Sequence, residues 1–321
     1  MKRIITLPLL ALIGALSGGC ATFISYQINH FTSQGIDFSQ LESQFAIGEY
    51  CESPDMNCVP YFQANPDIGS DTDLNFKLSI KANESTVNKS LFVAAEDKPR
   101  YKGTVLLLHG FAQSKNTMLA SALYYRSLGF HVLIPDLPGH GDSSAPRGMG
   151  VLGALSITAW LSTELDTPDL PRPLYIVGYS MGAVTALHIA RSMASPPNGL
   201  ILFAPMQRLD KAAIAFSQLE NSWYAMLFDE DDIVDGVNLS LNDKQINVHQ
   251  TDSVVLLETV KIPTLVFASN TDPIAPFEMF TTLNNPAVKV LEVDDTPHIL
   301  MLWLENWQHE ALSTFFSENG Q

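Results

Sequence analysis

The segment from Gly178 to Gly182 limits the possible fold of this chain more than any other stretch. It reads Gly-Tyr-Ser-Met-Gly and joins an apolar run, Leu174–Val177, to a helical run that begins near Met181. Glycines two residues on either side of a serine let a strand and a helix approach without Cβ clashes. A serine that only caps the helix is the alternative. The order of strand, turn and helix instead predicts a nucleophile, Ser180, held in strained geometry at the end of a buried strand.

Other apolar runs repeat this rhythm of strands and helices along the chain. Continuous apolar runs are typical of parallel strands that are covered on both faces. They lie at Thr104–Leu108, Leu200–Phe203 and Thr264–Ala268, and further strands are expected at Phe130–Ile134 and Val288–Val293. Alternation of polar and apolar residues over 75–81 and 89–94 predicts an antiparallel hairpin at a sheet edge. We therefore expect one α/β domain over residues 47–321, with a mostly parallel central sheet and helices on both faces.

The charge and the cysteine and histidine content exclude several classes of partner. A net charge of −16 at pH 7 argues against binding to nucleic acid, which would repel an acidic chain. It also disfavours adhesion to anionic lipids, so any membrane association must come from the N-terminus. No group of cysteines or histidines has the spacing of metal ligands, so we expect neither a metal nor an organic cofactor.

The N-terminus has the features of an export signal. Lys2 and Arg3 precede an uncharged apolar run, Ile4–Leu16, and small residues lead from there to Cys20. The run is shorter than the ~20 residues that span a bilayer. Its end resembles a bacterial lipoprotein signal, in which the cysteine is lipidated, although Ser17 stands where such signals usually carry an aliphatic residue.

A second interpretation of this N-terminus stays open. No charge occurs between Ile4 and Tyr26, so an uncleaved signal anchor could also span the membrane. A soluble secreted form is the third possibility. The first two interpretations place the protein in the bacterial cell envelope, tethered to a membrane and facing outside the cytoplasm. Residues 21–46 are polar and weakly patterned, and we expect them to form a spacer between the membrane and the domain.

Cys51 and Cys58 are the two cysteines that remain if Cys20 is lipidated. They flank a turn-rich segment, Glu52–Asn57, that would allow them to meet. An oxidising compartment lets a disulfide persist, and free surface thiols are unusual in exported proteins. We therefore expect a disulfide between them rather than two unpaired thiols.

Two loops carry a resemblance to a known superfamily. His109-Gly110-Phe111 follows one buried strand, and a D-x-x-G-H-G-x-S stretch, Asp136–Ser143, follows the next. From Tyr101 to the C-terminus the chain resembles α/β-hydrolases of the monoacylglycerol lipase-like and lysophospholipase-like group, which includes sequences labelled serine aminopeptidases of the S33 type. This resemblance implies an oxyanion hole formed by the N–H groups of Phe111 and Met181. We expect His109, Asp136 and His140 to stabilise their loops rather than to take part in the chemistry.

The same resemblance implies the other two members of a catalytic triad. Asp272 lies directly after the strand Thr264–Ala268, and His298 precedes the final helix, so the chain order is serine, aspartate, histidine. Asp294 and Asp295 are rival acids, but they precede His298 too closely to lie under its ring easily. Two further histidines lie inside predicted helices and fit the role of base less well, namely His188 and His309.

A long connection separates two of the buried strands. Residues 206–261 are too many for an ordinary loop, and in the superfamily this position carries a lid or cap. Apolar residues of this segment could line an acyl pocket, namely Ala212, Ile214, Phe216, Leu219, Trp223, Tyr224, Met226, Leu227 and Phe228. The acidic run Asp229–Asp232 is most simply a solvated face, with a cation site as the alternative.

These features together predict a membrane-tethered serine hydrolase that cleaves a carboxylic ester of a lipid or of another acyl-bearing molecule. A peptidase or amidase with the same triad is an alternative, because the cap rather than the triad selects the bond. A binding protein without activity on a hydrolase scaffold is another.

Overall fold

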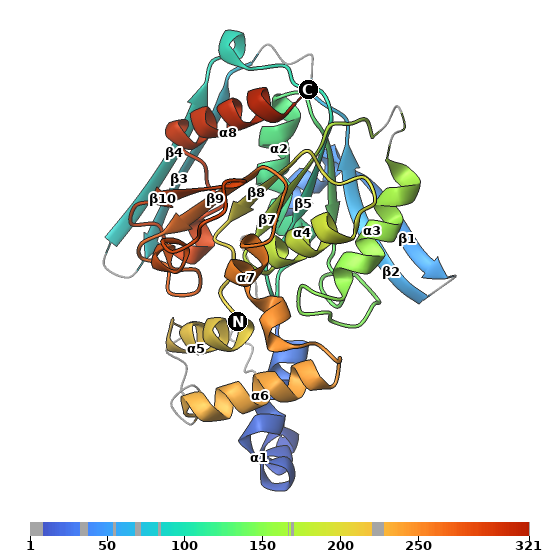
Figure 1. The fold of residues 1–321 in the computed structure, drawn as a ribbon, viewed down its shortest axis with the longest axis vertical. Helices are drawn as coiled ribbons and strands as arrows, with labels where there is room; N and C mark the ends of the chain where they lie inside the picture. The colour runs from blue at the N-terminus through green and yellow to red at the C-terminus, as the bar shows by residue number, and fades with distance from the viewer. Residues whose placement is uncertain are drawn as a thin grey trace.

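A computed structural model describes residues 9–32, 38–53, 56–67, 72–82, 85–165, 167, 170–219 and 228–320. An eight-stranded sheet forms the centre of the protein (Figure 1). Its strands are β1 (Ala46–Ser53), β2 (Met56–Ala64), β5 (Thr104–Leu108), β6 (His131–Pro135), β7 (Leu174–Tyr179), β8 (Gly199–Phe203), β9 (Thr264–Ser269) and β10 (Val288–Val293). Their spatial order is β1-β2-β6-β5-β7-β8-β9-β10.

Six of these strands, β5 to β10, run parallel to one another. At one edge of the sheet, β2 pairs antiparallel with β6, and β1 pairs antiparallel with β2. The five central strands β5 to β9 are almost entirely buried. A strand that is covered on both faces has no polar side, which explains the continuous apolar runs in the sequence. The predicted α/β fold with a mostly parallel sheet is confirmed.

Helices cover both faces of this sheet (Figure 1). One face carries α2 (Leu119–Ser127) and α8 (Asn306–Asn319); the other carries α3 (Gly153–Glu164), α4 (Met181–Ser192) and α7 (Ser253–Leu257). Alternate residues of β5 contribute to the two cores: Leu106 and Leu108 pack toward α3 and α4, and Val105 and Leu107 pack toward α2 and α8. Short 3-10 helices lie at Ser39–Gln44, Ala95–Asp97, Lys115–Met118, Val248–Thr251, Phe277–Phe280 and His298–Leu300.

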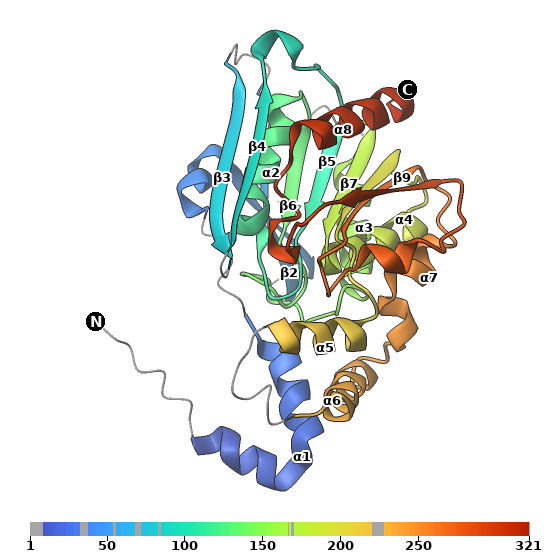
Figure 2. The same cartoon turned by 90° about the vertical axis from the view of Figure 1, so that its left-hand side faces the viewer.

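The predicted hairpin exists but does not lie where we expected it. β3 (Leu74–Ala82) and β4 (Ser85–Val93) pair antiparallel with each other and form a separate two-stranded sheet (Figure 2). The antiparallel edge of the main sheet is instead β1 with β2, over residues 46–64. The buried Lys89 of β4 fixes the separate hairpin, because its Nζ donates to Thr296 Oγ1 at 2.7 Å and to Glu305 Oε2 at 2.6 Å.

The connection between β8 and β9 is helical. It contains α5 (Leu209–Leu219) and α6 (Glu230–Asn242), which lie beyond the end of the sheet and away from the helices that flank it (Figures 1 and 2). Asp229 begins α6: its carboxylate accepts from the Asp232 N–H at 2.9 Å, and the Asp232 carboxylate accepts from the Asp229 N–H. The acidic run thus forms the N-cap and first turn of α6, where negative side chains stabilise a helix.

The segment that we expected to be a weakly structured spacer is helical over a large part of its length. The helix α1 (Leu9–His30), with non-helical backbone at Gly19, includes residues 21–30 and lies against α6 (Figure 1). Ile24 is buried, and a Cβ at Gly236 of α6 would lie 2.4 Å from the Ile24 side chain. The polar pattern of this segment does not predict the helix, because only one narrow stripe of apolar side chains packs against α6. Among the described residues, no helix has both the length and the hydropathy to cross a membrane.

Candidate active site

Ser180 lies in the sharp turn between β7 and α4. Its backbone has φ 53° and ψ −116°, and the residue is 5% exposed. A Cβ at Gly178 would lie 2.6 Å from Ala183 Cα, and a Cβ at Gly182 would lie 2.2 Å from the Leu108 carbonyl oxygen. Only glycine fits at these two positions, so the strand, the helix and the end of β5 come together around the serine.

Ser180, His298 and Asp272 form one continuous hydrogen-bonded chain. His298 Nε2 lies 2.9 Å from Ser180 Oγ, and His298 Nδ1 lies 2.6 Å from Asp272 Oδ2. A carboxylate can only accept, so Nδ1 carries a proton and Nε2 is free to accept the serine proton. Asp272 is 1% exposed, and its other oxygen accepts the N–H groups of Ile274 and Ala275. The carboxylate is therefore held in one orientation under the imidazole.

Tyr179, which the sequence analysis did not single out, supports the histidine. Its ring lies 5.2 Å from the His298 ring, and its hydroxyl donates to the His298 carbonyl oxygen at 3.0 Å. Burial, with the nearby Asp272 carboxylate, raises the pKa of Tyr179 far above its usual range, so the hydroxyl stays a donor. The only sequence signal was its place before the nucleophile at the end of a strand.

The rival acids do not contact His298. Asp294 Oδ1 accepts from Asn270 Nδ2 at 3.3 Å, and the Asp295 N–H donates to Asn270 Oδ1 at 3.1 Å. Both lie at the surface. They hold the turn between β10 and the histidine loop, which is a structural role.

Three other histidines have partners elsewhere. His188 Nε2 lies 2.8 Å from the Gln250 carbonyl oxygen, and His309 Nδ1 lies 2.8 Å from Tyr124 Oη. His109 Nε2 accepts the Leu137 N–H at 2.9 Å, so its Nδ1 donates to the Gly110 carbonyl oxygen. Burial lowers the pKa of His109 below its usual range, so His109 joins two loops as a neutral imidazole.

The loop after β5 carries Phe111 and begins against the nucleophile turn, because a Cβ at Gly182 would lie 2.6 Å from the His109 carbonyl oxygen. Gln113 Oε1 accepts the Gly110 N–H at 3.1 Å, and Ala112 has a positive φ of 60°, which turns the chain sharply. Among the described residues, no acceptor is within hydrogen-bond reach of the N–H of Phe111 or of Met181. Met181 is 1% exposed, and a buried N–H without a partner is rare in folded proteins.

The loop after β6 is fixed by a buried ion pair. Lys115 Nζ lies 2.6 Å from Asp136 Oδ2 and 2.7 Å from Asp142 Oδ2. Asp136 also accepts the N–H groups of Lys115 and Asp142, and a Cβ at Gly141 would lie 2.2 Å from its carboxylate. Asp136 thus joins the loops that follow β5 and β6 and is not free to act as an acid or a base.

The cysteines lie apart from this site. Cys51 and Cys58 face each other on β1 and β2, with an S–S distance of 2.01 Å, and form a disulfide. Cys20 is exposed and unpaired. Of the segment before it, residues 1–8 lie outside the described residues, as do Trp223, Tyr224, Met226 and Leu227 of the expected acyl pocket.

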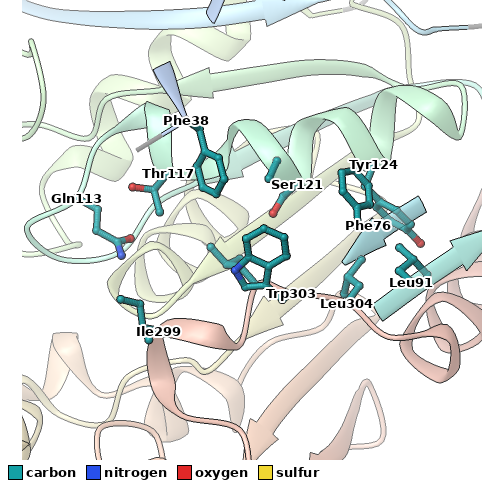
Figure 3. Close-up of a pocket in the computed structure, with 12 residues that line it drawn as sticks. Phe38, Phe76, Leu91, Gln113, Thr117, Ser121, Tyr124, Ile299, Trp303 and Leu304 are labelled. Carbon is teal, nitrogen blue, oxygen red and sulfur yellow. The ribbon is translucent and has the colours of Figure 1, made fainter. Parts of the chain in front are cut away.

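A groove lies beside the loop that follows His298 (Figure 3). One wall comes from α2 and the turn before it, and the other comes from Ile299 to Leu304. It is lined by Phe38, Phe76, Leu91, Gln113, Thr117, Ala120, Ser121, Tyr124, Ile299, Leu302, Trp303 and Leu304. The sequence analysis missed this groove because its residues come from five separate segments that only the fold brings together.

Comparison with known proteins identifies the family. A family model described as serine aminopeptidase, S33, matches residues 99–271, which is more than half of the chain. The chain belongs to this family of α/β-hydrolases. The match includes Ser180 and ends at residue 271, one residue before Asp272.

Curated relatives include proteins named lysophosphatidylserine lipase ABHD12. The one from Danio rerio is 34% identical over 117 residues, which is 34% of this chain and 29% of the relative. The one from Rattus norvegicus is 27% identical over 198 residues, which is 57% of this chain and 45% of the relative. The chain thus spans less than half the length of these relatives.

Two solved structures share the fold with a TM-score of 0.54 each. An esterase from Pyrococcus furiosus is 19% identical over 81% of this chain and 99% of that chain. A bacterial membrane phospholipase A, described as a virulence factor, is 17% identical over 97% of this chain and 95% of that chain. These similarities confirm the α/β-hydrolase fold.

Proposed function

We propose that the protein is a serine hydrolase in which Ser180, His298 and Asp272 form the catalytic triad. The observation that carries this proposal is the unbroken chain from Ser180 Oγ to His298 Nε2 at 2.9 Å and from His298 Nδ1 to Asp272 Oδ2 at 2.6 Å. A serine hydroxyl is a weak nucleophile at neutral pH, so His298 takes its proton during attack and returns it to the leaving group. Asp272 keeps the imidazole in the required tautomer and stabilises the imidazolium.

The reaction then passes through an acyl-enzyme. Attack of Ser180 Oγ on the carbonyl carbon gives a tetrahedral oxyanion, and the N–H groups of Phe111 and Met181 stabilise it. Their lack of another acceptor among the described residues supports this role. The leaving alcohol departs with the proton from His298, and water activated by the same imidazole releases the acid.

We infer that the substrate is a carboxylic ester of a lipid or of another acyl-bearing molecule. Two facts support this choice: the curated relatives are named as lipases of a lysophospholipid, and the cap carries exposed apolar side chains. Phe216 and Leu219 of α5 and Leu239 of α6 are 37%, 53% and 36% exposed. Exposed apolar side chains are common on surfaces where a lipid or acyl chain binds.

Tethering to a membrane through the N-terminus is part of the same proposal. Lys2, Arg3 and the apolar run that ends before Cys20 support export and lipidation, with a signal anchor as the alternative. Either form would place the enzyme in the cell envelope, outside the cytoplasm.

The proposed function is tested by turnover of p-nitrophenyl esters of graded chain length, compared with aminoacyl amides. We expect the esters to be hydrolysed and the activity to be lost in Ser180→Ala. Faster cleavage of the amides would support the peptidase alternative, which the family description makes a specific candidate. A folded wild-type protein that cleaves neither would support a binding protein on a hydrolase scaffold.

A further inference from the structure

Arg147 is a buried cation that no function assigned so far explains. It is 6% exposed, and within the described part of the chain its guanidinium donates only to main-chain carbonyl oxygens. Nε and Nη2 donate to Gly139 at 3.2 and 3.1 Å, and Nη1 donates to Ile28 and Phe31 at 3.0 Å each. Gly139 belongs to the loop after β6, whereas Ile28 and Phe31 lie at the C-terminal end of α1. Arg147 therefore joins two segments that are more than 100 residues apart.

This arrangement is energetically unusual. Burying a cation is costly unless other groups compensate its charge. Carbonyl groups at the C-terminus of a helix supply partial negative charge and have no partner within the helix. Burial lowers the pKa of Arg147 to about 10, so the guanidinium is still protonated at neutral pH. The carbonyl oxygens at the end of α1 thus stabilise the buried, positively charged guanidinium of Arg147.

The guanidinium also contacts the loop that carries the proposed oxyanion donor. It lies over the Phe111 ring, with Cζ 5.2 Å from the ring centroid. His140 meets the same ring edge-on, with centroids 6.0 Å apart. The Phe111 ring therefore contacts both a planar cation and a buried imidazole. Of these two groups, Arg147 donates hydrogen bonds to the end of α1.

The helix end that binds Arg147 is itself fixed to the cap. Asn29 Oδ1 accepts from Lys244 Nζ at 2.6 Å and from Ser240 Oγ at 3.2 Å. The Phe31 ring lies 5.7 Å from the ring of Phe216 on α5. The N-terminal helix, the cap and the loop with Phe111 are thus joined in one continuous set of contacts, and Arg147 lies where they meet.

We propose that Arg147 is a positioning residue for catalysis: it orients the loop with Phe111 by holding the Phe111 ring against the C-terminal end of α1. This inference rests on the proposed function, because it requires the Phe111 N–H to bind the oxyanion. Arg147 does not touch the reacting atoms. It acts on them through the position of one N–H, and it makes that position depend on the packing of α1.

The test uses the full-length chain in detergent and compares Arg147→Met with Arg147→Lys and Arg126→Met. Arg126 is the matched control, because it donates to the carbonyl oxygens of Asn65 and Gln44 and lies 5.3 Å over the Phe45 ring, away from the site. Each variant is assayed with p-nitrophenyl butyrate. Rates are normalised to the fraction of protein that a fluorophosphonate labels at end point, so that misfolded molecules do not count.

We expect Arg147→Met to lower kcat about 10- to 100-fold with KM changed less than threefold, because small misplacement of a catalytic group is costly. The inhibition constant of a trifluoromethyl ketone, whose bound form is a tetrahedral oxyanion, should rise by a similar factor. Arg147→Lys should also lose activity, since an ammonium lacks the planar set of five donors with which the guanidinium reaches both Gly139 and the end of α1. Arg126→Met should keep the wild-type kcat.

Two results would overturn the inference in different ways. If Arg147→Met keeps kcat and inhibitor affinity within twofold of the wild type, Arg147 has only a structural role, and the proposed function stands. If the wild type itself has no ester turnover that depends on Ser180, the proposed function fails and the inference fails with it. A loss of thermal stability with unchanged normalised kcat belongs to the first case.

Discussion

At the scale of single residues, geometry separates the proposed catalytic acid from its rivals. Asp272 is bonded to His298 across a gap of 26 residues, whereas Asp294 and Asp295 are much nearer in sequence and bond to Asn270. Proximity along the chain is weak evidence, because the histidine loop turns back over the nucleophile. The carboxylate must therefore come from the end of a neighbouring strand.

Replacement of Asp272 by asparagine tests this assignment. We expect Asp272→Asn to keep the fold and to lower kcat by about 10⁴, as for the triad aspartate of a serine protease, because the amide favours the wrong imidazole tautomer. Asp294→Asn and Asp295→Asn are matched controls with the same chemical change and should retain most of the activity. The measurement is ester turnover per folded molecule. Near-normal turnover in Asp272→Asn together with a large loss in a control would transfer the role to that control.

The buried histidines predict how stability depends on pH. Burial, with smaller contributions from His109 and Arg147, lowers the pKa of His140 to about 2, and burial also lowers the pKa of His109. Unfolded histidine has a pKa of about 6.5. As the pH falls below that value, the unfolded chain binds protons that the folded chain does not, so the free energy of unfolding decreases.

We therefore expect the wild type to lose stability as the pH falls from 7.5 to 5.0, by at most about 1.4 kcal/mol per pH unit for each such histidine. In His140→Gln, the difference in unfolding free energy between these two pH values should shrink by about 2 kcal/mol. Urea denaturation at both pH values measures it. An unchanged difference would show that His140 takes up its proton in the folded protein as well.

Residues with local signals were predictable from the sequence, and residues with only tertiary partners were not. Ser180 has glycines on both sides, and the positions of Asp272 and His298 after strands match the order that the resemblance to α/β-hydrolases implies. Lys115 and Arg147 have no comparable signal. Their roles depend on carbonyl and carboxylate oxygens from distant segments, which no spacing in the sequence reveals.

At the scale of elements, the edge of the sheet was the least predictable part. β1 and β2 were not expected as strands, because neither has the long apolar run or the regular alternation that marked the other strands, and β1, at the edge of the sheet, is only partly buried. Ile47 in β1 is 76% exposed, for example. The hairpin of β3 and β4 does show alternation, but alternation does not tell which sheet a strand joins. Its separate position depends on the contacts of Lys89 with Thr296 and Glu305.

The disulfide between Cys51 and Cys58 should stabilise this edge. It closes a short loop across paired strands, and the chain-entropy model assigns about 2–3 kcal/mol to a loop of this length, less any strain. We expect the double variant Cys51→Ser/Cys58→Ser to have a free energy of unfolding, measured by urea denaturation, that is lower by that amount, while its ester turnover is unchanged. Mass spectrometry without reduction tests the bond itself. Two thiols that react with an alkylating reagent in protein taken from the cell envelope would refute it.

At the scale of the whole molecule, the N-terminal helix belongs to the domain rather than only leading to it. The carbonyl of Ala21 and the side chain of Ile24 lie against Gly236 of α6, and Arg147 binds the other end of the helix. The polar composition of residues 21–46 gave no sign of this, because a few buried contacts are enough to fix a helix that is otherwise exposed. A lipid attached at Cys20 would therefore lie beside the cap, where this segment packs against α6.

The last prediction concerns the chemistry of that tether. Cys20 is exposed at the start of the segment that packs on α6, follows three small residues and is not needed for the disulfide. If it is lipidated, cells grown with a labelled fatty acid should yield a labelled mature protein that begins at Cys20. Cys20→Ala should abolish the label and leave the chain unprocessed or released. Cys51→Ser/Cys58→Ser is the matched control, because it removes two cysteines but keeps Cys20, and it should retain the label. An unlabelled mature protein that begins at Met1 would instead support the signal anchor, and the assignment of Ser180, His298 and Asp272 would be unaffected.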